Sequence, residues 1–155
     1  MLKYLNTDIV FQEVPDETSL AINITGCPCR CPGCHSPYLW ADTGLRLDAN
    51  AIDCLMAEYG ESITCVCFMG GDSAPHEVST LAAYLHRHYP RHKVAWYSGR
   101  QYIPLTVDKQ QFDYIKVGPY IAHLGSLKSP HGNQHMLKRQ PDGSFADITA
   151  RFHSR

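Results

Sequence analysis

Four cysteines lie close together in the first quarter of this 155-residue chain: Cys27, Cys29, Cys31 and Cys34. Three of them, Cys27, Cys31 and Cys34, follow the spacing C-x3-C-x2-C. Three thiolates on one short loop can ligate three corners of an iron–sulfur cube and leave the fourth iron free to bind a small molecule. The spacing therefore predicts a [4Fe-4S] cluster with three cysteine ligands and one open iron.

Two other uses of these thiols have to be weighed. A structural zinc site needs a fourth ligand, but Cys29 and His35 adjoin the other ligands too closely to complete a tetrahedron easily. A disulfide framework is typical of small secreted chains with an even number of cysteines, whereas this chain has seven. Cys29 is expected to be a spectator, because three thiolates already satisfy a cluster. Cys54, Cys65 and Cys67 are expected to pack in the core as small hydrophobic residues.

Length and composition indicate one soluble domain over residues 1–155, because the chain is too short for two comfortable cores. The net charge of −1 disfavours a general nucleic-acid binder, which usually carries a basic excess. No apolar run reaches the length of about 18 residues that spans a membrane, and the N-terminal residues lack a signal-peptide core. The sequence therefore predicts a cytoplasmic protein with no nucleic-acid partner and no membrane partner.

Strands and helices are predicted to alternate along the chain. Strands are expected at 19–25, 62–71, 93–99 and 113–120, and helices at 48–60 and 73–90, with a short helix at 107–112. Gly60 is expected to end the first long helix, and Asp72 or Ser73 to cap the second. The tail from about residue 126 is rich in polar residues, Gly, His and Pro. It is expected to have little regular structure and to be a segment that depends on a partner.

Alternating strands and helices, with glycines at the strand ends, predict an α/β fold with a mostly parallel sheet. A complete eight-stranded barrel takes about 250 residues, so this chain is expected to form a partial, open (βα) barrel. Loops that follow parallel strands gather at one edge of the sheet. The cysteine loop and the segments 70–72 and 98–100 are therefore expected to lie together.

The cysteine spacing resembles the cluster motif of the radical S-adenosylmethionine (SAM) family. The stretch "CPCRCPGCHSP" is most similar to the anaerobic (class III) ribonucleoside-triphosphate reductase activating proteins, since Gly33 stands where most radical SAM enzymes have an aromatic residue. The stretches "MGGDS", "AWYSGR" and "YIKVGPY…HGNQ" resemble later motifs of that family in the same order. The chain departs from the family pattern at four places: Ser73 replaces its proline, Val117 replaces its aspartate, "EVPDETS" stands where the family has G-P-G-x-R, and "SPHGNQ" stands for its G-S-S-N-Q.

The resemblance implies an activating enzyme that cleaves SAM reductively at the cluster. The 5′-deoxyadenosyl radical would then generate a glycyl radical on a large anaerobic ribonucleotide reductase, with a flavodoxin- or ferredoxin-like electron donor. The chemistry would be carried by the cluster and SAM, and no side chain is expected to be catalytic. Alternatives are an activator of another glycyl-radical enzyme, a radical SAM enzyme acting on a small molecule, and a zinc-binding docking module without activity.

The same resemblance implies seven residues that hold SAM: Gly33, His35, Gly70, Gly71, Asp72, Tyr97 and Ser98. Asp72 is as well explained as a helix cap, His35 as a solvated loop residue, and Tyr97 as a core residue. Asn133 and Gln134 belong to the last motif, and no role is assigned to them.

Overall fold

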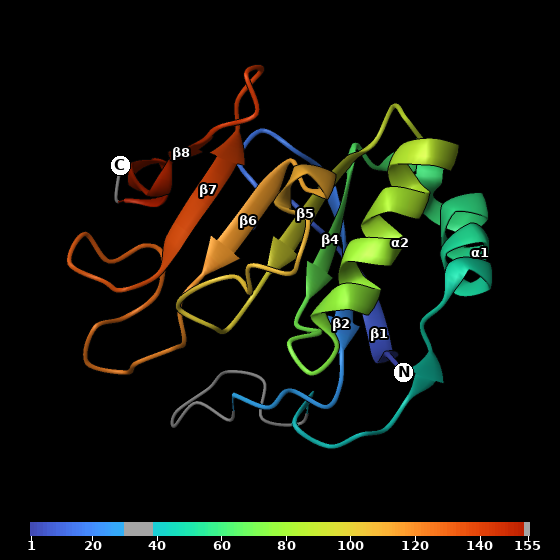
Figure 1. Ribbon diagram of the computed structural model, residues 1–155, viewed down its shortest axis with the longest axis horizontal. Coiled ribbons are helices and arrows are strands. Elements are labelled where there is room, and N and C mark those ends of the chain that lie inside the picture. Colours follow the sequence, from blue (N-terminus) through green and yellow to red (C-terminus); the bar gives the residue numbers. More distant parts are fainter. Residues whose placement is uncertain (30–38, 154–155) are drawn as a thin grey trace.

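An eight-stranded mixed sheet organises the chain, with strands in the order β3-β1-β2-β4-β5-β6-β7-β8 (Figure 1). It is seen in a computed structural model that describes residues 1–29 and 39–153. The strands are β1 (Lys3–Val10), β2 (Ser19–Ile24), β3 (Leu45–Arg46), β4 (Cys65–Met69), β5 (Lys93–Tyr97), β6 (Tyr114–Val117), β7 (His135–Arg139) and β8 (Phe145–Asp147). The α-helices are α1 (Ala49–Tyr59) and α2 (Pro75–His88), and 3-10 helices span Gly60–Ser62, Lys109–Gln111 and Thr149–Phe152.

The centre of the sheet is parallel, and this part was predicted correctly. Strands β2, β4, β5 and β6 are neighbours in that order and run the same way. Their apolar residues are paired in register, for example Leu20 with Val66 and Val66 with Val94. All four carboxyl ends therefore lie at one edge of the sheet, where their arrowheads point in Figure 1.

The prediction of a mostly parallel, partial barrel is wrong. Four of the seven neighbouring strand pairs are antiparallel, because β1 pairs with β2 and β3, and β7 pairs with β6 and β8. The sheet stays open, with β3 at one edge and β8 at the other. These flanking strands are short or largely solvent-exposed, so they carry no continuous apolar run that would reveal them in the sequence.

The tail was also predicted wrongly in its second half. Strands β7 and β8 and the 3-10 helix Thr149–Phe152 follow residue 134 and continue the sheet. The Met136 side chain is fully buried, and the backbone N–H of Met136 donates to Thr149 Oγ1 at 2.9 Å. The tail thus contributes structure to the same core as the parallel strands.

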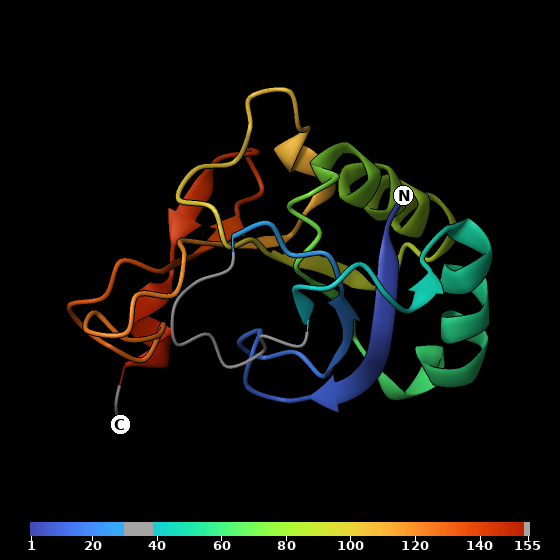
Figure 2. The ribbon, with the colours of Figure 1, turned by 90° about the horizontal axis from the view of Figure 1, so that it is seen from below.

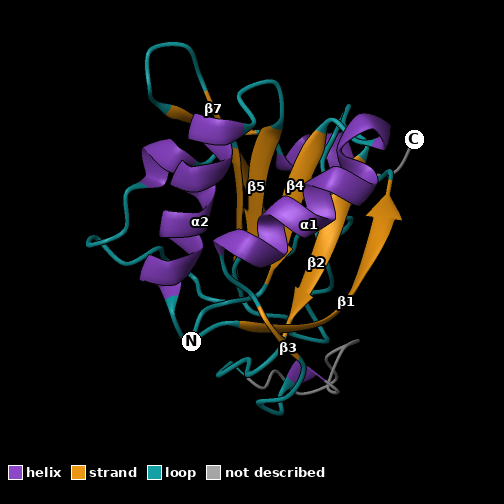
Figure 3. Ribbon diagram, turned by 90° about the vertical axis from the view of Figure 1, so that its right-hand side faces the viewer, coloured by secondary structure: helices purple, strands orange, loops and turns teal. Residues whose placement is uncertain are grey.

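Helices α1 and α2 pack against one face of the sheet (Figure 3). Their buried residues agree with the predicted spacing: Ile52, Leu55 and Met56 in α1, and Val78, Leu81, Ala82 and Leu85 in α2. Helix α1 ends at Gly60 as predicted, but the glycine is right-handed (φ −54°) and the chain continues as a 3-10 turn. Neither Asp72 nor Ser73 caps α2, whose N-cap is Ala74 without a side-chain hydrogen bond. Among the described helices, none has the length and apolar character to cross a membrane.

The opposite face of the sheet is covered by loops and by the tail. Cys65 and Cys67 are fully buried there, packed with residues that include Val14, Leu127 and Met136. Burial raises the pKa of the Cys65 thiol to about 12, and that of the Cys67 thiol well above its ordinary value. Both therefore remain protonated core residues, as predicted. Cys54 is exposed, so its expected place in the core is wrong.

A carboxylate clamp joins the two α-helices. The Asp53 carboxylate of α1 accepts hydrogen bonds from the hydroxyl groups of Tyr89 at 2.6 Å and Tyr84 at 2.8 Å. These bonds hold the pKa of Asp53 below its ordinary value. Because the folded pKa is lowered, the clamp stabilises the fold above the pKa of the unfolded carboxyl, and this contribution is lost as the pH falls through the folded pKa.

We expect Asp53→Asn to lower the melting temperature at pH 7. The difference from the native chain should shrink as the pH falls below about 4, where the carboxyl of the unfolded chain is protonated. Thermal unfolding followed by circular dichroism between pH 3 and pH 7 measures both effects. Glu58→Gln, at an exposed position of the same helix, is the matched control. Equal melting temperatures of Asp53→Asn and the native chain at pH 7 would contradict the clamp.

Candidate functional site

The base of the cysteine loop is closed by backbone hydrogen bonds. The N–H of Gly26 donates to the carbonyl of Ala41 at 3.0 Å, and the N–H of Cys27 donates to the carbonyl of Leu39 at 3.1 Å. The segment leaving β2 and the segment returning toward β3 are therefore held together at the position of the first predicted ligand. The predicted site residues Cys31, Cys34, Gly33 and His35 lie outside the described residues.

A cavity lies at the carboxyl edge of the parallel strands, the end of the sheet that Figure 2 views. Every parallel strand contributes to its wall, as does the cysteine loop. The lining residues are Asn23, Ile24, Cys27, Cys29, Leu39, Trp40, Met69, Gly70, Asp72, Tyr97, Gly99, Lys116, Tyr120 and Gln134. The prediction that the cysteine loop and the segments after the strands gather at one edge is confirmed for the described residues.

Asp72 is a buried carboxylate on the wall of this cavity. Its side chain accepts a hydrogen bond from the Ser98 hydroxyl at 2.5 Å and one from the Gly99 N–H at 2.8 Å. Its carbonyl accepts from the Arg100 guanidinium at 3.2 Å. The residue is only 2% exposed. Its side chain is thus turned toward the loop after β5, away from the helix that it was alternatively expected to cap.

Lys116 is a functional candidate that the sequence reasoning missed. It lies within β6, is 7% exposed and lines the cavity. Its ammonium group donates to the carbonyls of Ser98 at 3.1 Å and Gly118 at 2.7 Å, and lies 5.8 Å from the centre of the Tyr97 ring. Lysine is rarely buried so deeply. The signal in the sequence is a charged residue inside the otherwise apolar run "YIKVG".

Ser98 connects the two buried charges. Its hydroxyl group donates to Asp72 and its carbonyl accepts from Lys116, while its own N–H donates to the carbonyl of Lys116 at 2.9 Å. The residue is fully buried and is absent from the residues that line the cavity. Ser98 was predicted to hold a ligand, and the structure gives it a supporting position behind Asp72 and Lys116.

The two glycines after β4 have different surroundings. Gly70 lines the cavity, and its carbonyl accepts from the Trp96 indole at 2.7 Å. Gly71 faces the core instead: its φ is +92°, and a Cβ there would lie 2.5 Å from Val78 Cγ2. The structure brings Gly70 to the predicted site and explains Gly71 by backbone conformation and close packing.

Tyr97 and Cys29 also line the cavity. The Tyr97 hydroxyl donates to the backbone carbonyl of Glu13, and burial raises the pKa of Tyr97 well above its ordinary value. Tyr97 thus lines the cavity, while its hydroxyl group is bonded to Glu13 in the β1–β2 connection. The Cys29 sulfur lies 3.9 Å from Asp72 Oδ2, and a Cβ on Gly99 would come within 3.0 Å of it. The spectator role of Cys29 stays a prediction.

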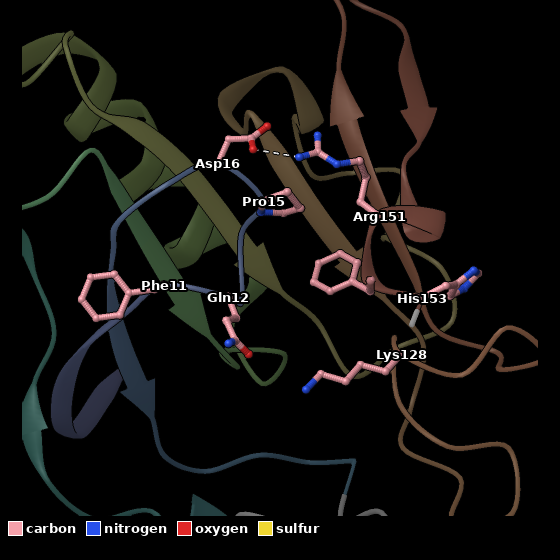
Figure 4. Close-up of a pocket in the computed structure, with 8 residues that line it drawn as sticks. Phe11, Gln12, Pro15, Asp16, Lys128, Arg151 and His153 are labelled. Atoms are coloured by element: carbon pink, nitrogen blue, oxygen red, sulfur yellow. Dashed lines mark hydrogen bonds and ion pairs between the residues drawn. The ribbon is translucent and has the colours of Figure 1, made fainter. Parts of the chain in front are cut away.

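A second hollow lies beside the core cluster on the helix-free face (Figure 4). Phe11 and Asp16 from the β1–β2 connection form one side, and Lys128, Arg151 and His153 form the other. The Arg151 guanidinium and the Asp16 carboxylate are joined across it at 2.8 Å. No residue of the cysteine loop lines this hollow among those described, so we place the functional site in the cavity with Cys27.

A known protein family matches the part of the chain that forms most of this cavity. Residues 18–122 match the family described as "4Fe-4S single cluster domain". The chain belongs to this family. The matched stretch is more than half of the chain and contains the cysteine loop and all four parallel strands, whereas β1, β7 and β8 lie outside it. Comparisons with curated proteins and with solved structures find no match.

The described residues fit a cluster at this edge of the sheet. The Cys27 thiol lines the cavity, and its backbone is fixed at the closed base of the loop. Trp40 lines the same cavity, and its indole nitrogen is buried without a hydrogen-bond partner among the described residues. A thiolate or sulfide of an iron–sulfur cluster is an anionic acceptor for such a donor. The 4Fe-4S domain and its cavity are therefore consistent with each other.

We expect Gly71→Ala to destabilise the fold more than Gly26→Ala. Both glycines have positive φ, so each alanine costs about 1–2 kcal/mol for the left-handed backbone. At Gly26 a Cβ meets its nearest atoms only at 4.0 Å, whereas at Gly71 the contact with Val78 adds about 1–3 kcal/mol of overpacking. Urea unfolding of the two variants measures the difference. Equal losses would show that Gly71 is retained for another reason.

Proposed function

We propose that this 4Fe-4S domain binds SAM beside its cluster and cleaves it reductively. The proposal joins the family membership to the arrangement of Asp72 and Lys116 in the cavity. When bound, the cluster and SAM supply the chemistry: one electron breaks a carbon–sulfur bond to give methionine and a 5′-deoxyadenosyl radical, which takes a hydrogen atom from its target. The protein's own residues bind and orient the ligand and exclude water.

The observation that carries the proposal is the pair of opposite buried charges. Asp72 and Lys116 both line the cavity, and Ser98 donates to the carboxylate of Asp72 and accepts from the ammonium group of Lys116. The amino-acid end of SAM carries an ammonium and a carboxylate, so it is complementary to this pair. Charge-assisted hydrogen bonds at a buried site are strong and directional. We assign the ligand's ammonium to Asp72 and its carboxylate to Lys116.

Other lining residues suit the remainder of the ligand. Ile24, Leu39 and Met69 form an apolar part of the wall, which suits the adenosyl group. Cys27 lies at the cluster end of the cavity, and the ligand would bind the iron that the three predicted cysteine ligands leave open. The ligand set Cys27, Cys31 and Cys34 is part of this proposal.

The target of the radical rests on the sequence resemblance. We propose a glycine of a large anaerobic ribonucleotide reductase, with a flavodoxin- or ferredoxin-like protein as electron donor. Binding of that partner would shield the radical from water and from side reactions. Electron paramagnetic resonance of the reductase after incubation with the reduced protein and SAM tests the target. A glycyl radical that forms equally well after Cys27, Cys31 and Cys34 are all changed to Ala would refute it.

The cleavage reaction is tested with the anaerobically reconstituted protein. We expect cluster iron and sulfide in the native chain and formation of 5′-deoxyadenosine when reductant and SAM are added. We expect Lys116→Met to weaken SAM binding about 10- to 100-fold, which corresponds to one charge-assisted hydrogen bond. Equilibrium dialysis with labelled SAM measures the affinity.

Lys128→Met is the matched control, because it removes an exposed lysine away from the cavity. Its SAM affinity should equal that of the native chain. Zinc without sulfide, together with intact SAM, would replace the proposal by a zinc-binding docking module. Cleavage of SAM without radical transfer to the reductase would retain the chemistry and point to another glycyl-radical enzyme or to a small-molecule substrate.

We expect Cys27→Ala to lose the cluster and Cys29→Ser to retain it. Cys27 belongs to the three-thiolate spacing, and the Cys29 sulfur lies beside the Asp72 carboxylate. Iron and sulfide analysis with absorption spectra of the two reconstituted variants measures cluster content. Loss of the cluster in Cys29→Ser, with retention in Cys27→Ala, would show that the wrong three thiols were chosen.

A further inference from the structure

The indole N–H of Trp40 is a buried donor that has no hydrogen-bond partner in the part of the chain that the structure describes. Its nitrogen is inaccessible to solvent and makes no hydrogen bond to any described residue. Trp40 as a whole is only half-buried. The other tryptophan of the sequence, Trp96, is fully buried, and its N–H donates to the carbonyl of Gly70 at 2.7 Å. Buried polar groups are nearly always hydrogen-bonded in native proteins. A bound group can therefore supply the hydrogen-bond acceptor that the Trp40 indole lacks among the described residues.

The position of Trp40 indicates which group this is. Trp40 follows Leu39, whose carbonyl accepts the N–H of Cys27, so the tryptophan lies at the closed base of the cysteine loop. Trp40 and Cys27 line the same cavity. An iron–sulfur cluster bound at Cys27 is rich in hydrogen-bond acceptors, because its thiolates and sulfides are all anionic sulfur.

We propose that the Trp40 indole donates a hydrogen bond to a sulfur atom of the cluster and thereby raises its reduction potential. Reduction adds one negative charge to the cluster, so a donor to its sulfur stabilises the reduced form more than the oxidised form. Trp40 is a positioning and tuning residue and takes no part in bond breaking. This role requires only the cluster and holds whether or not SAM is the ligand.

The test is a redox titration of the reconstituted protein without SAM, followed by electron paramagnetic resonance. Trp40→Phe keeps an aromatic ring and removes the donor, so we expect the midpoint potential to become more negative while iron and sulfide content stays native. Ala41→Val changes an exposed side chain at the same loop base, outside the residues that line the cavity, and leaves every donor in place. We expect its midpoint potential to equal that of the native chain.

Two outcomes would overturn the proposal. One is a native midpoint potential in Trp40→Phe, and the other is an equal shift in Ala41→Val, which would assign the effect to packing. If Trp40→Phe keeps the native potential but binds SAM more weakly, the donor serves the ligand, and the cluster role is refuted while SAM binding stands. Absence of SAM binding in the native chain would refute the proposed function and leave the redox result unaffected.

A second measurement does not depend on the variant folding or holding its cluster. The native chain is labelled with 15N in the tryptophan indoles, and the reduced cluster is examined by pulsed electron paramagnetic resonance. We expect a 15N coupling to the cluster, and its absence would overturn the proposal. Reconstitution with selenide in place of sulfide identifies the acceptor: a changed coupling indicates an inorganic sulfide, and an unchanged one indicates a cysteine thiolate.

Discussion

The functional edge of the sheet depends on the hydrogen bonds of one buried serine. Ser98 follows β5 and lies between Asp72, which follows β4, and Lys116 in β6. Two opposite charges are costly to bury separately, and here each is met by donors or acceptors of the same short segment. Without Ser98, the Asp72 carboxylate and the Lys116 ammonium group would each lose a hydrogen-bond partner. The ends of β4, β5 and β6 must therefore stay aligned for both charges to remain buried at this edge.

Around this edge, the architecture divides into a parallel centre and antiparallel additions. The family match covers the centre, the cysteine loop and the two-residue strand β3, and the additions β1, β7 and β8 lie outside it. The additions pair with the two outer strands of the parallel centre: β1 pairs with β2, and β7 pairs with β6. No residue of β1, β7 or β8 lines the cavity; Gln134, which immediately precedes β7, is the lining residue nearest to them in the sequence.

Two positions along the cysteine loop base connect this framework to the proposed chemistry. The backbone hydrogen bond from the N–H of Cys27 to the carbonyl of Leu39 fixes the position of the first predicted ligand relative to β2. Trp40 then brings a donor to the same place, so the returning segment contributes to the site as well as closing the loop. Cluster tuning and ligand binding would thus rely on different residues of one cavity.

The sequence alone determined the parallel strands, both α-helices and their buried faces, because continuous apolar runs and helical spacing report burial directly. It also indicated an iron–sulfur protein, because ligand spacing within one loop is a local property. Only the tertiary structure decided the antiparallel flanks, since partly exposed flanking strands such as β1 leave a weak apolar pattern. It alone revealed Lys116 and the hydrogen bonds that join it through Ser98 to Asp72, because these partners come from segments distant in the sequence. It alone also placed Trp40 at the same cavity.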